Sequence, residues 1–305
     1  MFRMRMRDQG LISKYFNSYP FKLYVNCSGV RIQNPGERVF IRVPINESCQ
    51  IVTPGLSTEV ICLQFPLLAK YENIVHGIFA RHGGVSESPY NTLNTSYDTD
   101  DRPECVKENL KIIQSFMGAK HLRFMNQVHG KDILVLGQDT PLSVKKASSA
   151  DAMITHMPGL ALMVKQADCQ GIIIFDPRKN VISNVHCGWR GNTSDILGSV
   201  VRRMRSSFGS KASDLIAVIG PSLGPCCAEF IDYKQIFPEE FRRFMVKDNY
   251  FDLLQISRWQ LIKAGLKGEN IEVTNICTKC RTDLFYSYRA EGVTGRFTTV
   301  VMLKD

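Results

Sequence analysis

Short apolar runs rich in β-branched residues recur along the chain, and turn residues separate them, a pattern typical of β-strands. Between residues 59 and 305 the pattern predicts strands at Glu59–Phe65, Ile74–Ala80, Phe124–Val128, Ile133–Val135, Ala152–Ile154, Ala161–Val164, Gly171–Phe175, Val181–Val185, Leu215–Ile219, Ile271–Cys277, Phe285–Arg289 and Thr298–Leu303. We find no internal repeat and no low-complexity segment.

Four segments carry apolar residues at the three- and four-residue spacing of a helix. In the first, Pro103 opens the first turn and Gly118 follows the last, as is typical of helix ends. The predicted helices are Pro103–Met117, Thr193–Phe208, Pro238–Met245 and Leu253–Ala264.

The first 58 residues form a separate region of the sequence. Strand-like runs at Phe21–Val25, Val39–Val43 and Cys49–Val52 are separated by Pro-Gly turns. We therefore predict a small β-rich extension over residues 1–58 and a catalytic domain over residues 59–305. The extension contains no histidine, so we assign it packing or contact with a partner rather than chemistry.

Composition and charge narrow the class of protein. The chain has 305 residues, of which 44% are apolar and 22% charged, enough to bury a sizeable core. No run of about 18 uncharged apolar residues occurs, so we predict no membrane span. The formal charge of +9 suits an acidic surface or a phosphate-bearing small substrate as partner, the alternative being a basic surface of no special meaning. Because the basic residues are spread along the chain without a known binding motif, nucleic acid is not an expected partner.

The ten cysteines are irregularly spaced, unlike a secreted disulfide framework. We therefore expect a reducing compartment and a cytoplasmic protein. The Arg-rich segment Met1–Asp8 leaves an organelle address as the alternative.

Three segments each follow a strand-like run and each offer one ligand suited to zinc. They are Asn126-Gln127-Val128-His129-Gly130, Ala167-Asp168-Cys169 and Val185-His186-Cys187-Gly188-Trp189-Arg190-Gly191. Zinc favours imidazole nitrogen and thiolate sulfur, and catalytic sites commonly keep three protein ligands and one open position. We therefore predict that His129, Cys169 and His186 bind one catalytic metal. Such a metal would lower the pKa of its water from about 15.7 to near 7.

Other interpretations of the same residues remain open on spacing alone. His129 could be a buried structural residue and Cys169 inert, or Cys169 and His186 could be the nucleophile and base of a cysteine hydrolase. A structural site of four thiolates could combine Cys277 and Cys280 with Cys226-Cys227, although adjacent cysteines are a poor second pair.

Several polar residues are candidates for contacts around the metal. Asp168 could orient a ligand or handle a proton, and Arg190 could bind phosphate or carboxylate through its planar fork. Arg81 and Ser86 flank a Gly-Gly turn that would let the backbone approach an anion or a ribose.

The order of motifs over Ile74–Leu303 resembles that of the laccase-domain family, also called the YfiH-like or polyphenol oxidase family. The matching stretches are Arg81-His-Gly-Gly-Val-Ser86, Thr92-Leu-Asn94, Asn126-Gln-Val-His-Gly130, Ala167-Asp-Cys169, Val185-His-Cys-Gly-Trp-Arg-Gly191, Gly220-Pro221-Ser222, Phe285-Tyr-Ser-Tyr-Arg289 and Thr294-Gly-Arg296. The resemblance implies an α+β fold layered α-β-β-α, and zinc bound by His129, Cys169 and His186.

The resemblance also implies an activity. Family members act as purine nucleoside phosphorylases on adenosine, inosine, guanosine and methylthioadenosine, with phosphate as co-substrate, and they deaminate adenosine. Catalytic roles then fall to Asp168, Cys169 and Arg190, and substrate or phosphate contacts to Arg81, His82, Ser86, Asn94, Gln127 and Arg190. The alternatives are a copper-dependent polyphenol oxidase and an amidase that edits cell-wall precursors.

Two positions depart from the family pattern. Cys187 follows the ligand His186 where a small residue is more usual, which would add a competing thiol beside the metal. Gln170-Gly171 replaces a more usual proline-containing run after Cys169.

Overall fold

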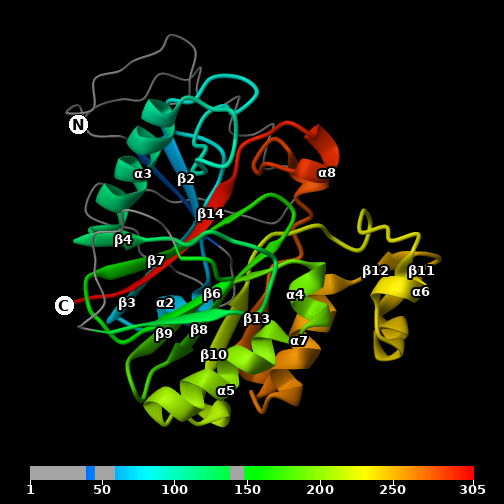
Figure 1. Cartoon of the computed structure of the whole chain (residues 1–305). Helices are drawn as coiled ribbons and strands as arrows, with labels where there is room; N and C mark the ends of the chain where they lie inside the picture. Colours follow the sequence, from blue (N-terminus) through cyan, green and yellow to red (C-terminus); the bar gives the residue numbers. More distant parts are fainter. Residues whose placement is uncertain (1–38, 45–58, 138–147) are drawn as a thin grey trace.

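Apolar side chains on both faces of the central strands produce two stacked β-sheets in the computed structural model (Figure 1). The structure describes residues 39–44, 59–137 and 148–305. In spatial order, the first sheet contains β1 (Val39–Pro44), β2 (Glu59–Gln64), β3 (Ile74–Phe79), β14 (Phe297–Leu303), β7 (Leu160–Gln166) and β4 (His121–Arg123). The second contains β13 (Ile271–Val273), β10 (Ile216–Ile219), β8 (Gln170–Asp176), β9 (Val181–Cys187), β6 (Ala152–Thr155) and β5 (Ile133–Leu136). A separate hairpin joins β11 (Met245–Lys247) to β12 (Tyr250–Phe251).

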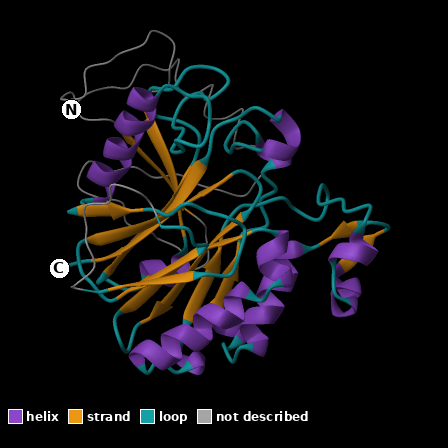
Figure 2. Cartoon of the chain, viewed as in Figure 1, coloured by secondary structure: helices purple, strands orange, loops and turns teal. Residues whose placement is uncertain are grey.

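Helices cover the two outer faces of this pair of sheets (Figure 2). The α-helices are α2 (Pro66–Ala69), α3 (Pro103–Met117), α4 (Trp189–Thr193), α5 (Ile196–Phe208), α6 (Tyr233–Ile236), α7 (Leu253–Lys263) and α8 (Tyr288–Glu291). The 3-10 helices are η1 (Ala212–Asp214), η2 (Glu239–Phe244), η3 (Gly268–Asn270) and η4 (Lys279–Arg281). Helix α3 packs on the first sheet, whereas α5 and α7 pack on the second.

Three apolar cores hold these layers together. One lies between the sheets, one between α3 and the first sheet, and one between the second sheet and α5 with α7. Asn184 on β9 also ties the sheets, since its amide donates to the backbone oxygens of Leu162 and Thr299 at 2.8 Å each. The expected α-β-β-α layering is confirmed.

Two predicted strands are wrong, and both segments lie near the candidate site. Residues 124–128 form a loop, because the amides of Val128, His129 and Gly130 donate to the carboxylate of Asp151 instead of to a neighbouring strand. The segment predicted as Phe285–Arg289 turns into α8, whose N-cap Ser287 accepts a hydrogen bond from the amide of Ala290.

Helix predictions need smaller corrections. The helix expected from Thr193 is interrupted at Asp195, whose φ of 52° is left-handed, so α4 and α5 are separate. The segment Pro238–Met245 is the 3-10 helix η2 rather than an α-helix. In the extension, the strand at Val39–Val43 is confirmed as β1, which pairs antiparallel with β2. The predictions at Phe21–Val25 and Cys49–Val52 lie outside the described residues.

Candidate metal centre

Three strands of the second sheet bring the predicted ligands together. In the antiparallel pair β8–β9, Gly171 lies opposite His186, so Cys169, just before β8, is next to that histidine. The loop before β5 contributes His129. The ligand atoms of His129, Cys169 and His186 all lie within 4.8 Å of one another, and Cys169 Sγ is 3.9 Å from His129 Nε2.

The spacing of these atoms fits a tetrahedral metal. Zinc bonds of about 2.0–2.1 Å to nitrogen and about 2.3 Å to sulfur place two tetrahedral ligands roughly 3.6 Å apart. The observed distance between Cys169 and His129 is close to that value. One thiolate and two imidazoles also form a donor set that zinc favours. The three residues therefore fit a zinc ion that keeps a position open for water or substrate.

Asp151, which the sequence analysis did not single out, orients both histidines. Its Oδ1 lies 2.8 Å from His186 Nδ1 and accepts the amide of His129 at 3.0 Å. Its Oδ2 accepts the amide of Gly130 at 2.6 Å. A carboxylate on one ring nitrogen of a ligating histidine fixes the ring and leaves Nε2 for the metal. The signal in the sequence was an aspartate directly before the apolar strand Ala152–Ile154.

The charges of the metal-free site favour a thiolate. Burial would raise the pKa of Cys169, but the positive charge of His186 and hydrogen bonds from both histidines outweigh it and lower the pKa to about 6. Burial would likewise lower the pKa of His186, but the Cys169 thiolate and the carboxylate of Asp151 raise it to about 9. The site thus holds the deprotonated sulfur that a metal needs.

The backbone conformation is unusual at two residues of the site. His129 and Asp168 have φ angles of 58° and 84°, a left-handed region that is unfavourable for residues other than glycine. Such strain is commonly found at functional sites. Gly188 is needed for a different reason, because a Cβ there would lie 2.8 Å from Cys169 Sγ.

The carboxylate of Asp168 holds loops together, and its described hydrogen bonds include none to the two histidines. It accepts hydrogen bonds from the hydroxyls of Thr278 at 2.6 Å and Ser287 at 2.7 Å, and from the amide of Arg289 at 2.6 Å. Its backbone oxygen also accepts the amide of Leu223 at 2.9 Å. Asp168 therefore fixes the segment that presents Cys169. A role in proton transfer stays a prediction.

The structure places Arg81, Ser86 and Asn94 in a buried network beside the Gly-Gly turn. Arg81 donates to Thr282 O at 2.7 Å, Asn91 O at 3.1 Å and Glu291 at 2.8 Å. Ser86 and Asn94 both donate to Asp101. Their observed contacts support the loop, and the predicted contacts with substrate remain untested.

Gln127 and His82 also have partners within the protein. The side chain of Gln127 exchanges hydrogen bonds with the backbone of Lys165 at 2.7 and 2.8 Å. His82 Nε2 lies 2.5 Å from the backbone oxygen of Asp283.

Cys187 and Arg190, which follow His186 along the chain, lie in different environments. Cys187 is fully buried in the core beneath α5, and burial raises the pKa of its thiol. It is not among the clustered ligand atoms, so the expected competition for the metal is absent within the described residues. Arg190 is exposed, and its guanidinium lies 5.1 Å from the ring centre of Trp189, which packs in an aromatic cluster.

Arg296 is a further cation near the metal site. Burial lowers the pKa of its guanidinium, and the negative charges of Cys169 and Asp168 oppose that shift. Its Nη1 donates to the backbone oxygens of Thr294 at 2.8 Å and Gly295 at 2.9 Å. The motif Thr294-Gly-Arg296 contained this signal, but the sequence analysis gave it no role.

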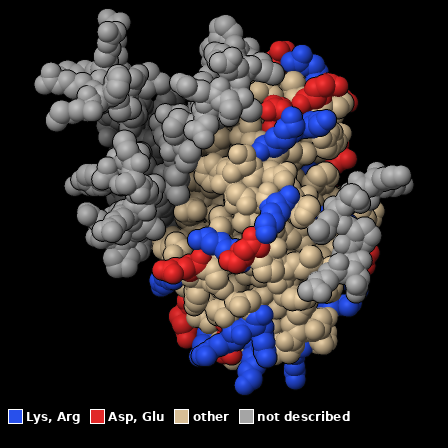
Figure 3. All heavy atoms as spheres, turned by 90° about the vertical axis from the view of Figure 1, so that its left-hand side faces the viewer, with Lys and Arg blue, Asp and Glu red and all other residues tan. Residues whose placement is uncertain are grey.

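Outside the site, charges are mixed on the face drawn in Figure 3, where acidic and basic side chains are interspersed on a mostly uncharged surface. A hollow of about 710 Å³ lined by Lys131, Arg202 and Arg203 among others includes none of the three ligands. In the described part of the chain, none of the helices has the length and apolar content needed to span a bilayer.

Comparisons with known proteins identify the class. The layered fold matches that of a crystal structure titled hypothetical protein YfiH from Bacillus licheniformis, with a TM-score of 0.73, 27% identity, and coverage of 80% of this chain and 96% of that one. YlmD from Geobacillus stearothermophilus matches with a TM-score of 0.72, 26% identity and coverage of 81% and 96%.

Residues 75–304 match the family model described as multi-copper polyphenol oxidoreductase laccase, and the chain belongs to this family. A relative from Bacteroides thetaiotaomicron, 29% identical over 79% of this chain and 96% of its own length, is named purine nucleoside phosphorylase. Purine nucleoside phosphorylase YfiH of Shigella flexneri is 31% identical over 73% of this chain and 91% of its own length.

Proposed function

We propose that this chain is a zinc-dependent purine nucleoside phosphorylase with adenosine deaminase activity at the same site. The observation that carries the proposal is the convergence of His129, Cys169 and His186 on one point, with Asp151 fixing both histidines. The names of the relatives supply the substrate class. The substrates are adenosine, inosine, guanosine and methylthioadenosine.

His129, Cys169 and His186 would hold the zinc ion, which would supply Lewis-acid chemistry and lower the pKa of water there. The protein itself positions the three ligands and orients the substrate. In phosphorolysis a phosphate oxygen forms a bond to C1′ of the ribose while the bond from C1′ to the purine nitrogen breaks, and the base leaves with a proton. In deamination, water replaces the amino group of adenosine, which leaves as ammonia.

Arg296 is the residue we assign to the phosphate. It is half-buried, and the negative charges of Cys169 and Asp168 act to raise the pKa of its guanidinium against the effect of burial. A cation in that position would favour an anion beside the metal. Arg190, one of the candidates that the sequence suggested together with Arg81 and Ser86, is exposed and stacks on Trp189. The KM for phosphate distinguishes the two arginines. We expect Arg296→Gln to raise this KM and the matched variant Arg190→Gln to leave it nearly unchanged. The reverse ranking would return the role to Arg190.

The description of the family suggests copper oxidase chemistry, but the candidate ligands favour zinc. Within the described ranges, which include all six histidines, the histidine-containing cluster has only two imidazoles. Multi-copper oxidation of phenols generally needs several histidines. We therefore do not propose phenol oxidation.

The test uses purified protein of known metal content. It is incubated with adenosine, with and without phosphate, and the products are separated by chromatography. We expect adenine and ribose-1-phosphate only when phosphate is present, and inosine in both conditions. Cys169→Ser should lose both products, and Cys105→Ala, which changes a cysteine in α3, should retain them. Absence of both products from zinc-loaded protein would refute the purine assignment.

A further inference from the structure

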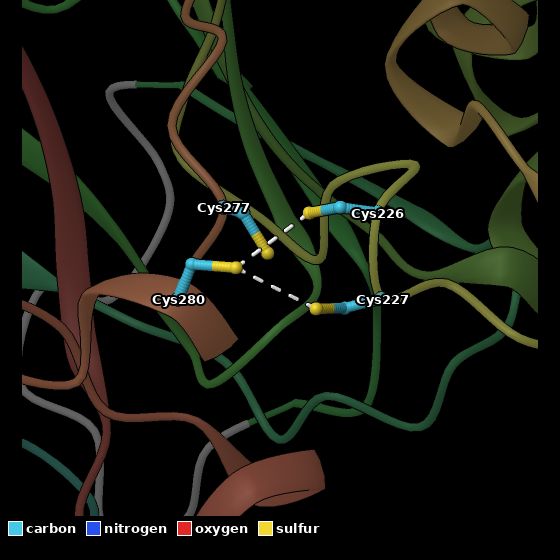
Figure 4. A group of neighbouring side chains, drawn as sticks. All are labelled: Cys226, Cys227, Cys277 and Cys280. Carbon is cyan, nitrogen blue, oxygen red and sulfur yellow. Dashed lines mark hydrogen bonds between the residues drawn. The ribbon is translucent and has the colours of Figure 1, made fainter.

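A second cluster of metal-binding side chains lies outside the site described above. Cys226, Cys227, Cys277 and Cys280 have sulfur atoms that all lie within 4.8 Å of one another. Figure 4 shows the four side chains pointing toward a common centre, with Cys226 and Cys227 coming from one loop and Cys277 and Cys280 from a loop and the adjoining 3-10 helix η4. None of the four is a ligand of the first site.

Strand pairing explains why two distant segments meet here. Strands β10 and β13 are parallel neighbours, so the loops that follow them emerge at the same edge of the sheet. The pairing continues beyond the strands through an isolated bridge between Ser222 and Cys277. Ser222 N donates to Ile276 O at 3.3 Å and Thr278 N donates to Ser222 O at 3.0 Å. The loops are therefore held together before any metal binds.

A tight turn overcomes the objection that adjacent cysteines form a poor ligand pair. In an extended strand, neighbouring side chains point to opposite faces. Cys226 and Cys227 instead lie in a turn in which the amides of Cys227 and Ala228 both donate to Gly224 O at 2.9 Å. The turn lets both sulfurs face Cys277 and Cys280 (Figure 4).

The distances between sulfurs match metal coordination better than a disulfide. Cys280 Sγ is 3.6 Å from the Sγ atoms of both Cys226 and Cys227. Tetrahedral zinc with bonds of about 2.3 Å places its sulfurs about 3.8 Å apart, whereas a disulfide needs about 2.05 Å. The amide of Gly224 also donates to Cys277 Sγ at 3.3 Å, a contact that suits a coordinated thiolate.

We propose that these four cysteines bind a second zinc ion through four thiolates, at a structural site separate from the catalytic one. Four protein ligands fill a tetrahedral shell and leave no position for substrate. The site lies at the surface, since Cys226 and Cys280 are exposed and the other two are half-buried. The ion would join the loop after β10 to the loop after β13.

This second ion would act on the first site through Asp168. Thr278, between the ligands Cys277 and Cys280, donates to the Asp168 carboxylate at 2.6 Å. Leu223, three residues before Cys226, donates its amide to Asp168 O at 2.9 Å. The two loops that the ion joins therefore both hold the residue next to Cys169, which makes the four cysteines positioning residues.

The zinc content of the intact protein tests this proposal, which does not depend on the reaction catalysed. Native mass spectrometry of the full chain should show two zinc ions per molecule, one for each cluster. Cys280→Ser should lose one ion, and Cys169→Ser should lose one and keep the other. The control Cys105→Ala should keep both.

Several outcomes would overturn the proposal. These are one zinc ion in the wild-type chain that disappears in Cys169→Ser, two ions retained in Cys280→Ser, a second ion whose mass is that of iron or copper, or a chain lighter by two hydrogens because of a disulfide in the cluster. The Cys169→Ser measurement leaves all four cysteines intact, so it decides the matter even if Cys280→Ser does not fold.

Discussion

The two ligand clusters differ in composition, burial and closure, although both are built at the strand ends of the second sheet. The first contains two imidazoles and one thiol, with His186 buried and hydrogen-bonded to the buried carboxylate of Asp151. The second contains four thiols, and two of them are exposed. Three ligands leave a coordination position open for chemistry, whereas four close the shell.

In the proposed roles, one fold separates a reactive site from a supporting one. At the first cluster, histidines and a carboxylate set the charge on a single sulfur, which is the arrangement needed to tune a reactive metal. At the second, the sulfurs come from two loops whose backbones are already hydrogen-bonded, which is the arrangement needed to fasten them. Asp168 lies between the clusters, since it precedes Cys169 and accepts a hydrogen bond from Thr278.

The largest expected effect comes from removing one sulfur from each cluster in turn. We expect Cys169→Ser to lower purine turnover by about a hundredfold or more, above the usual cost of changing a residue that only supports a ligand. Cys280→Ser should instead lower the melting temperature and retain measurable turnover below it. Turnover and the melting temperature are measured for both variants. If the two variants lost turnover equally at a temperature at which both are folded, the two clusters would not have separate roles.

The next largest effect is expected from the carboxylate of Asp151, which distinguishes the first cluster from the second. Asp151→Asn removes the charge that His186 and the amides of His129 and Gly130 share. Loss of such a partner typically costs roughly 10- to 100-fold in metal affinity or activity. Zinc competition with a coloured chelator measures it. Asp132→Asn, which changes an exposed residue three positions after His129, is the control and should bind zinc as the wild type does.

The stability contributed by the first cluster should depend on pH. In the metal-free protein the pKa of Cys169 is lowered to about 6 and that of His186 is raised to about 9. The stabilisation from His186 is present below its ordinary pKa of 6.5 and is lost as the pH rises through about 9. That from Cys169 is present above 9.0 and is lost as the pH falls through about 6.

Zinc needs thiolate and neutral imidazole, so binding must displace the proton of His186 within this window. Zinc affinity of the first site should therefore rise by up to about tenfold per pH unit between these two pKa values. The Cys280→Ser variant, which keeps only the first site, allows the measurement by chelator competition. An affinity that stays constant across the window would show that His186 is already neutral.

The smallest effect concerns the link between the clusters. Thr278→Val keeps the shape of the side chain but removes its hydrogen bond to Asp168. Losing a hydrogen bond to a charged group costs about 1.5–3 kcal/mol of the free energy of unfolding. Denaturant unfolding measures this loss, and zinc content should stay unchanged. Thr282→Val is the matched control, because its hydroxyl has no hydrogen bond among the described residues. Equal stability of the two variants would remove Asp168 as the link.

Much of the architecture was predictable because short apolar runs mark strands buried on both faces and helical spacing marks the buried face of a helix. The central strands β7, β8 and β9 were predicted at nearly their observed positions, and so was α3 with its Gly118 end. A strand prediction was wrong where a side chain, and not a neighbouring strand, accepts the hydrogen bonds of the backbone amides. Residues 124–128 are apolar enough for a strand, but Asp151 accepts the amides that follow them.

The sequence by itself selected His129, Cys169 and His186 as candidate ligands, since imidazole and thiolate are the donors that zinc favours. Only the tertiary structure decided what surrounds them. Asp151 faces His186 because β6 pairs with β9, and the four cysteines meet because β10 pairs with β13. Strand pairing joins residues that are far apart in the chain, so the spacing of residues along the sequence could not reveal these contacts.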